Sequence, residues 1–193
     1  MPRKYLKGFS GLRVFPITTN TEESYIVGTM IKVPSAQSLS KEEQSESEDI
    51  FADDGIWDTD TDVTGEEVTI GLVELSNELR AQLRGGTYSE ETKTYSFKRG
   101  DVAPELACAY RGLLADGTYR MFKNYRFKVS SVKMDLNTKG SGNRAGVEIT
   151  GKFLDRACDG KFYDIKDTEE GNADLTWLDS IEKVPAEELE EST

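Results

Sequence analysis

The regular alternation of apolar and polar side chains along residues 118–136 constrains the fold of this chain more than any other feature. A period of two places successive side chains on opposite faces of a β-strand, so this segment predicts one long strand. The apolar residues change parity at Ser130 and Ser131, which predicts a β-bulge or a crossing between sheets that keeps both apolar sets buried. The first set is Tyr119, Met121, Tyr125, Phe127 and Val129, and the second is Val132, Met134 and Leu136.

Six further segments have the β-branched and apolar composition of strands: residues 11–19, 26–34, 67–75, 105–114, 146–158 and 161–165. The short polar stretch 18–24 predicts a hairpin between the first two segments. Asp116-Gly117 and Asp159-Gly160 predict two more antiparallel hairpins, with type I′ turns. The predicted fold is therefore mainly β, a β-sandwich.

One short helix is expected between these strands, in the sequence SNELRAQLRGG. Ser76 is a typical N-cap residue, Leu79 and Leu83 lie four residues apart on one helix face, and Gly85 is a typical terminator. The sequence predicts a strand followed directly by a short helix that flanks the sandwich.

Acidic residues are concentrated in one part of the chain. The formal net charge is −12, but the window 41–67 contains twelve acidic residues against one base, and the rest of the chain is almost neutral. The twelve are Glu42, Glu43, Glu46, Glu48, Asp49, Asp53, Asp54, Asp58, Asp60, Asp62, Glu66 and Glu67. Because like charges and solvation oppose packing, we predict a long inter-strand loop over residues 35–62, disordered near residues 38–48 in the monomer.

Four apolar residues interrupt this acidic segment: Ile50, Phe51, Ile56 and Trp57. They would be exposed unless they dock somewhere. Two interpretations remain open, since they can pack on their own subunit or on a neighbouring one. They are the candidate subunit-contact residues.

The chain is long enough for one ordinary domain. We expect it to span residues 1–168, with the long acidic loop inside it. Residues 169–193 form a C-terminal arm that ends in an acidic stretch, with Trp177 and Leu178 as its docking point.

Composition excludes several function classes. The absence of histidine removes the common Ser-His-Asp, Cys-His and His-metal sites. Cys108 and Cys158 lie fifty residues apart without a CxxC motif, which predicts two reduced, buried thiols. The negative charge disfavours tight binding to DNA, and no apolar run predicts a membrane span or a signal peptide. We expect a protein made in the cytoplasm, without a cofactor, metal or catalytic residue.

Other candidate sites are weak. Asp58, Asp60 and Asp62 have the spacing of half a calcium loop, but Val63 stands where the turn needs glycine and Thr69 where a closing glutamate is needed. Carboxylate pairs on a loop lack the fixed separation that glycoside hydrolysis requires. A basic row, Arg120, Lys123, Arg126 and Lys128, has aromatic residues between its members. The row could bind single-stranded nucleic acid, but such rows more often pair with acidic cross-strand neighbours or with the next subunit.

Several strings of the sequence are similar to the phi13-type major tail proteins, the tail tube proteins of long-tailed bacteriophages. They are KYLKGFSGLRVFPIT, FADDGIWDTDTDVTGEEVTIGLVELSNELRAQLRGG, PELACAYRGLLADGTYRMFKNYRFKVSSVKMDLNTKG and VEITGKFL. The second string is the most specific, because in it an acidic segment, an amphipathic strand and a Ser-capped helix follow one another. The similarity spans nearly the whole chain.

This resemblance implies a structural virion protein and not an enzyme. Subunits of such proteins join into hexameric rings that stack into a tube, with strands of neighbouring subunits closing an inner barrel through which DNA passes without specific binding. It implies homo-oligomeric contacts, contacts with the tape measure protein, chaperones, the tail terminator and distal tail proteins, and a location in the virion tail, with no membrane. If the acidic segment lies outside the tube, the charge of the lumen would come from residues such as Asp135, Glu148 and Asp155.

Two other classes remain as alternatives. A tail completion or decoration protein would dock once in a virion instead of polymerising. An enzyme with a carboxylate-only site would need two acids in a deep pocket with divergent pKa values.

Overall fold

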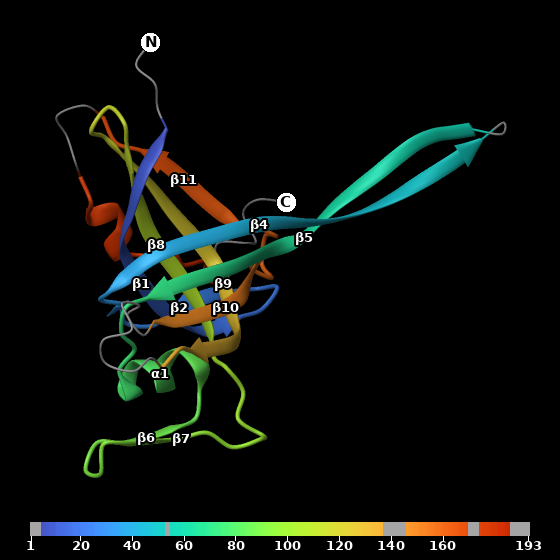
Figure 1. Cartoon of the computed structure of the whole chain (residues 1–193). Helices are drawn as coiled ribbons and strands as arrows, with labels where there is room; N and C mark the ends of the chain where they lie inside the picture. Colours follow the sequence, from blue (N-terminus) through green and yellow to red (C-terminus); the bar gives the residue numbers. More distant parts are fainter. Residues whose placement is uncertain (1–4, 53–54, 137–145, 170–173, 186–193) are drawn as a thin grey trace.

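The computed structural model describes residues 5–52, 55–136, 146–169 and 174–185 (Figure 1). The strands are β1 (Leu6–Asn20), β2 (Tyr25–Val27), β3 (Ile31–Lys32), β4 (Ala36–Ala52), β5 (Gly55–Leu72), β6 (Thr87–Ser89), β7 (Thr94–Ser96), β8 (Glu105–Leu114), β9 (Tyr119–Met134), β10 (Val147–Leu154) and β11 (Tyr163–Asp167). The helices are α1 (Asn77–Arg84) and a short 3-10 turn, η1 (Thr176–Asp179).

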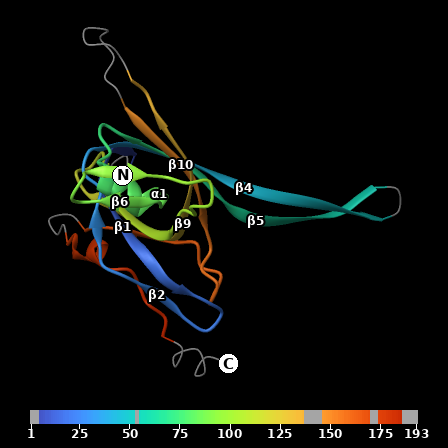
Figure 2. The same cartoon turned by 90° about the horizontal axis from the view of Figure 1, so that it is seen from below.

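The predicted mainly β fold with one short flanking α-helix is confirmed. The strands belong to one antiparallel sheet of nine strands in the order β2-β1-β8-β9-β10-β5-β4, to which β3 adds at β1 and β11 at β9. The sheet curls around the main core without closing, and β6 and β7 form a separate two-stranded hairpin beside α1 (Figures 1 and 2).

The prediction of a long acidic loop over residues 35–62 is wrong. This segment forms β4 and the first part of β5, which pair along almost their whole length, from Ala36 opposite Leu72 to Ala52 opposite Gly55. Only the part of β5 from Glu66 to Leu72 also pairs with β10. The remainder, residues 45–52 and 55–63, runs clear of the body as a two-stranded ribbon, which we call the arm (Figures 1 and 2).

A β-bulge lies where the arm leaves the body. Gln44 is opposite Gly65 and Ser45 is opposite Val63, so the register skips one residue of β5. Gly65 has φ of 149°, and a Cβ there would lie 2.8 Å from the main-chain oxygen of Phe153. This position therefore requires glycine.

The predicted bulge at Ser130 and Ser131 in β9 is confirmed. Between Ser131, opposite Thr150, and Val129, opposite Gly151, the register of β9 and β10 shifts by one residue at Ser130. The bulge brings Val129 and Val132 to the same core. Met134 and Leu136 are exposed, so the prediction that the whole second apolar set is buried is wrong.

The two Asp-Gly turns have different outcomes. Asp116-Gly117 joins β8 and β9 as a hairpin, but only Gly117 has positive φ, so the turn is not of type I′. Asp159-Gly160 does not make a hairpin of its flanking strands, and this prediction is wrong. Both β10 and β11 pair with β9, one after the other along the same strand.

The helix begins and ends as its sequence predicts. The Ser76 side chain accepts a hydrogen bond from the Leu79 amide at 3.2 Å, and Gly85 caps the other end with φ of 84°. Leu79 and Leu83 are buried against the main core.

A second, smaller core lies on the outer face of β1, β8 and β9. Its members include Phe15, Tyr25, Met121 and Tyr125, and the C-terminal segment 174–185 covers it. Leu178 is fully buried there, and Val184 forms an isolated antiparallel bridge with Tyr25, with N–O distances of 2.8 and 2.9 Å.

Candidate assembly surfaces

The arm has two different polar faces. The register places Glu46 opposite Asp62 and Glu48 opposite Asp60, so carboxylates face each other directly on one side, which we call the acidic face. Hydroxyl side chains gather on the other side. There Ser47 and Thr61 lie 3.2 Å apart, and Thr59 donates a hydrogen bond to Asp49 at 2.8 Å.

These contacts do not stabilise the arm on its own. A two-stranded ribbon is marginal in water. Like charges directly opposite each other oppose pairing, by up to about 1 kcal/mol per pair. The acidic face contains two such pairs, Glu46 with Asp62 and Glu48 with Asp60. The arm therefore has the properties of a segment that needs an external surface.

The tip of the arm presents large apolar side chains to solvent. Trp57 lies at a second register shift of the arm and is 75% exposed, and Ile50 and Ile56 are also exposed. The structure therefore places three of the four predicted contact residues together at the tip. The side chain of Phe51 lies outside the described residues. None of the three is buried on the rest of its own chain.

A polar face of the sheet continues from the base of the arm. A row of charged residues crosses its strands, with Glu42 opposite Glu67, Glu67 opposite Lys152 and Lys152 opposite Lys128. The next row is Ser40, Thr69, Thr150 and Ser131. This part of the outer face is left uncovered by the C-terminal segment, and its charges nearly cancel.

The predicted basic row does not form a continuous basic surface. Arg120 makes a bidentate pair with Asp167 at 2.7 and 2.8 Å, and Arg126 pairs with Glu105 at 2.7 Å. Lys123 is buried beneath the ring of Trp177, with its Nζ 4.1 Å from the ring centre. Only Lys128 of the four is exposed, so the row offers no stacking platform for nucleic acid.

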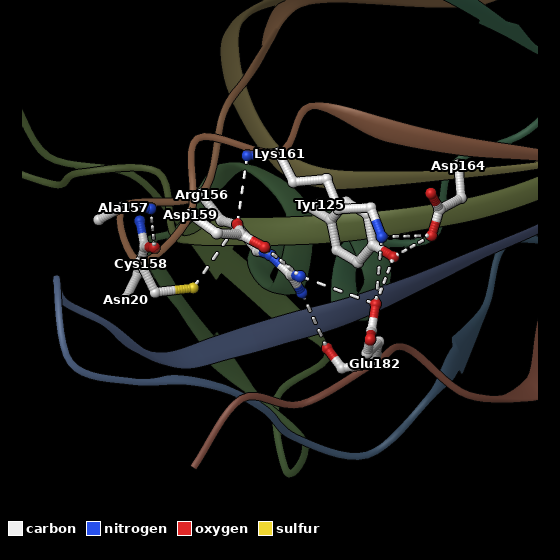
Figure 3. Close-up of polar contacts among 9 residues, drawn as sticks. All are labelled: Asn20, Tyr125, Arg156, Ala157, Cys158, Asp159, Lys161, Asp164 and Glu182. Atoms are coloured by element: carbon white, nitrogen blue, oxygen red, sulfur yellow. Dashed lines mark hydrogen bonds and ion pairs between the residues drawn. The ribbon is translucent and has the colours of Figure 1, made fainter. Parts of the chain in front are cut away.

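A polar cluster fastens the C-terminal segment to the body (Figure 3). Arg156 is buried, donates to both carboxylate oxygens of Asp159 at 2.6 and 2.7 Å, and reaches the main-chain oxygen of Glu182 at 3.5 Å. Its guanidinium also lies over the ring of Tyr125, 4.3 Å from the centre. The Tyr125 hydroxyl donates to Asp164 at 2.5 Å.

The ionisation of this cluster is set by burial and by its partners. The Arg156 guanidinium holds the pKa of Asp159 below its usual range. Burial and hydrogen bonding to Asp164 raise the pKa of the Tyr125 hydroxyl, and burial raises the pKa of the Cys158 thiol. These shifts favour the charged form of Asp159 and the protonated forms of Tyr125 and Cys158, so the cluster is suited to a structural role in fastening the C-terminal segment.

The two cysteines are free thiols with different exposure: Cys108 is buried as predicted, whereas Cys158 is partly exposed. Asp58, Asp60 and Asp62 lie along one extended strand and do not converge as a calcium loop would. Among the described residues there is no group of three or more potential metal-binding side chains. Across that same part of the chain, no helix has the length and hydropathy needed to cross a membrane.

Sequence reasoning missed the Arg156 cluster and the arm. An arginine directly after a strand, three residues before an aspartate, was the available signal for the first. The string DTDTD was the signal for the second, because its alternation of acidic and β-branched residues has the period of a strand.

No protein-family model matches the chain, and no curated protein matches it. Solved structures give distant likenesses. The tube terminating cap of the anti-feeding prophage has a TM-score of 0.47 at 11% identity, covering 81% of this chain and 88% of that one. A chain of the sheath-tube complex of an extracellular contractile injection system, PVC, in the extended state has a TM-score of 0.44 at 10% identity over 81% and 88%.

A chain of the anti-feeding prophage baseplate has a TM-score of 0.43 at 8% identity, covering 89% of this chain and all of that one. Likenesses at this level do not assign a function.

Proposed function

We propose that this chain is a structural subunit of a phage-tail-like tube that assembles from copies of itself. The observation that carries the proposal is the arm. It projects from the body, its acidic face opposes its own pairing, and its tip exposes Ile50, Ile56 and Trp57. A neighbouring subunit that covers the ribbon would account for its exposed apolar side chains.

The edge of the sheet supports lateral assembly. Within the described residues β4 pairs with β5 alone, so the other edge of this 17-residue strand presents free main-chain donors and acceptors. Exposed edges of this length pair readily with another strand. Pairing of β4 with a neighbouring subunit would extend the curled sheet around a ring, and closure of the ring would leave no free edge.

The uncovered polar face suits a passage for DNA. It combines serine and threonine with three acids and three bases: Glu42, Glu67, Glu148, Lys128, Lys133 and Lys152. A face without net positive charge gives little counterion release on DNA and therefore little binding. The acidic face of the arm continues this surface and repels phosphate. We assign this face to the lumen.

The finer assignment follows the resemblance of several sequence strings to the phi13-type major tail proteins. In it the subunits form hexameric rings that stack into the tail tube of a virion, with the tape measure, terminator and distal tail proteins as further partners. The subunit is then made in the host cytoplasm and acts without catalysis.

Electron microscopy of the purified chain over a concentration series tests this function. The expected result is hollow tubes or rings of uniform diameter. In the matched variant, residues 45–64 are replaced by Asn-Gly, so that Gln44 and Gly65 stay in one tight hairpin. It should fold with an unchanged core and fail to stack.

A protein that stays monomeric at high concentration, alone and on a preformed tail initiator, contradicts the tube assignment. Binding of a single copy to a finished tail would then favour the tail completion or decoration protein.

A further inference from the structure

An apolar groove opens where the curled sheet fails to close, between the start of β1 and the base of β4. Its volume is about 390 Å³, within the range of about 300–1,000 Å³ that is usual for ligand pockets. Its apolar walls come from four strands and include Leu6, Phe9, Leu39, Tyr110 and Phe122.

The groove contains a polar atom that needs a partner. Tyr110 is 3% exposed, and its ring stacks on Phe122 with centroids 5.0 Å apart and meets Phe9 edge-on at 5.7 Å. Its buried hydroxyl has no hydrogen-bond partner within the described part of the chain. A ligand that offers a hydrogen-bonding group inside the groove would satisfy it.

Basic residues lie at the rim. Lys41 pairs with Glu66 at 2.5 Å, so its charge is already balanced. The side chain of Arg111 lies on the other face of β8, where it donates to the Ser10 hydroxyl at 3.1 Å and its guanidinium lies over the ring of Tyr119, 4.6 Å from the centre. The exposed Lys7 is next to the groove residue Leu6. The rim thus favours an acidic occupant.

We propose that this groove receives the tip of the arm of a second copy of the chain. The fit is chemical. Ile56 and Trp57 match the apolar walls, and the indole N–H of Trp57 is a donor that the Tyr110 hydroxyl can accept. The flanking Asp58 matches the cationic side chain of the exposed Lys7.

The arm cannot fill its own groove. Lys41 at the groove and Ile50 at the tip lie on the same extended strand, β4, nine residues apart. At about 3.3 Å per residue this is roughly 30 Å, and the strand points away from the groove. The contact is therefore between copies, with tip and groove on different surfaces. Such heterologous contacts generate rings or open filaments. The inference rests on the proposed function and names the partner surface of the arm.

Disulfide trapping tests the contact directly. Gly55→Cys on one tagged chain and Gln37→Cys on a second chain are mixed in a Cys158→Ser background, because Cys158 is the partly exposed native thiol. Gly55 lies at the tip and Gln37 lines the groove, so both substitutions leave Trp57 and the apolar walls in place. Oxidation should give the mixed dimer at least tenfold faster than the control pair of Gly55→Cys with Glu148→Cys, whose second cysteine lies on the outer face. Circular dichroism verifies that each variant is folded before mixing.

A charge exchange provides the second measurement. Lys7→Glu should raise the concentration for half-assembly by about threefold, and the same chain carrying Asp58→Lys as well should recover most of the loss. Tubes that form while the trapping rate equals that of the control pair would overturn the groove contact and leave the tube function standing. Trapping of short oligomers without tubes would support the contact and contradict the tube. If neither faster trapping nor tubes are observed, the groove contact and the tube function are both overturned.

Discussion

Replacing Leu178 by alanine tests whether the C-terminal segment is packed on the body as part of the folded core. Leu178 is 0% exposed and packs in the second core with Tyr25, Met121 and Tyr125. A buried Leu→Ala change costs about 2–5 kcal/mol, through lost burial and the cavity left behind. The side chain lies on a short 3-10 turn that can partly relax, so we expect about 3 kcal/mol.

Thermal unfolding followed by circular dichroism provides the measurement. At about 2–4 °C per kcal/mol for a domain of this size, L178A should lower the Tm by roughly 6–12 °C. The control is W57A, which removes a larger side chain that is 75% exposed and should change the stability of the monomer by no more than about 0.5 kcal/mol. If L178A shifts the Tm no more than W57A does, the C-terminal segment is not part of the folded core.

Three further variants test other features. Because Arg156 holds the pKa of Asp159 low, the pair stabilises the fold above the unfolded pKa of about 3.9, and this contribution is lost as pH falls through the folded pKa. At neutral pH the wild type should therefore have a higher Tm than D159N, and this difference in Tm should disappear as the pH is lowered below the folded pKa. A difference in Tm that does not depend on pH would contradict the pairing. S76A removes the cap on the Leu79 amide and should cost about 1 kcal/mol in a urea titration, whereas S76D should retain most of the stability. G151A places a Cβ 2.4 Å from a main-chain oxygen of β9 and should cost about 1–3 kcal/mol, and an unchanged urea midpoint would show that β9 and β10 separate easily.

The sequence predicts those elements whose apolar residues follow a clear period. Ser76, Leu79 and Leu83 specify α1 by cap and spacing, and the parity change at Ser130 specifies the bulge of β9. Both predictions rest on local chemistry that each segment carries by itself.

The arm escaped prediction because neither of its faces is apolar. Strand prediction relies on one buried face, and in residues 45–48 the alternation is between acids and hydroxyls. The partner of β11 escaped for another reason. Asp159-Gly160 makes a turn, but whether the next strand returns to β10 or pairs with β9 depends on which strand has room along its edge. Only the tertiary fold decides that.

The groove and the Arg156 cluster required the three-dimensional structure. Tyr110 and Leu39 are seventy-one residues apart and meet only because the sheet curls. The exposed residues Ile56 and Trp57 could be identified as contact candidates, but no local pattern identifies the surface that would receive them.

The bulge at Gly65 sets the direction in which the arm leaves the body. The ribbon beyond it extends over about eight residues per strand, roughly 25 Å. A change of about 10° in direction at its base would displace the tip by roughly 4 Å, about the spacing of neighbouring strands. In the proposed tube, the close approach of Gly65 to the main-chain oxygen of Phe153 in one subunit would therefore help to set the position of the next subunit.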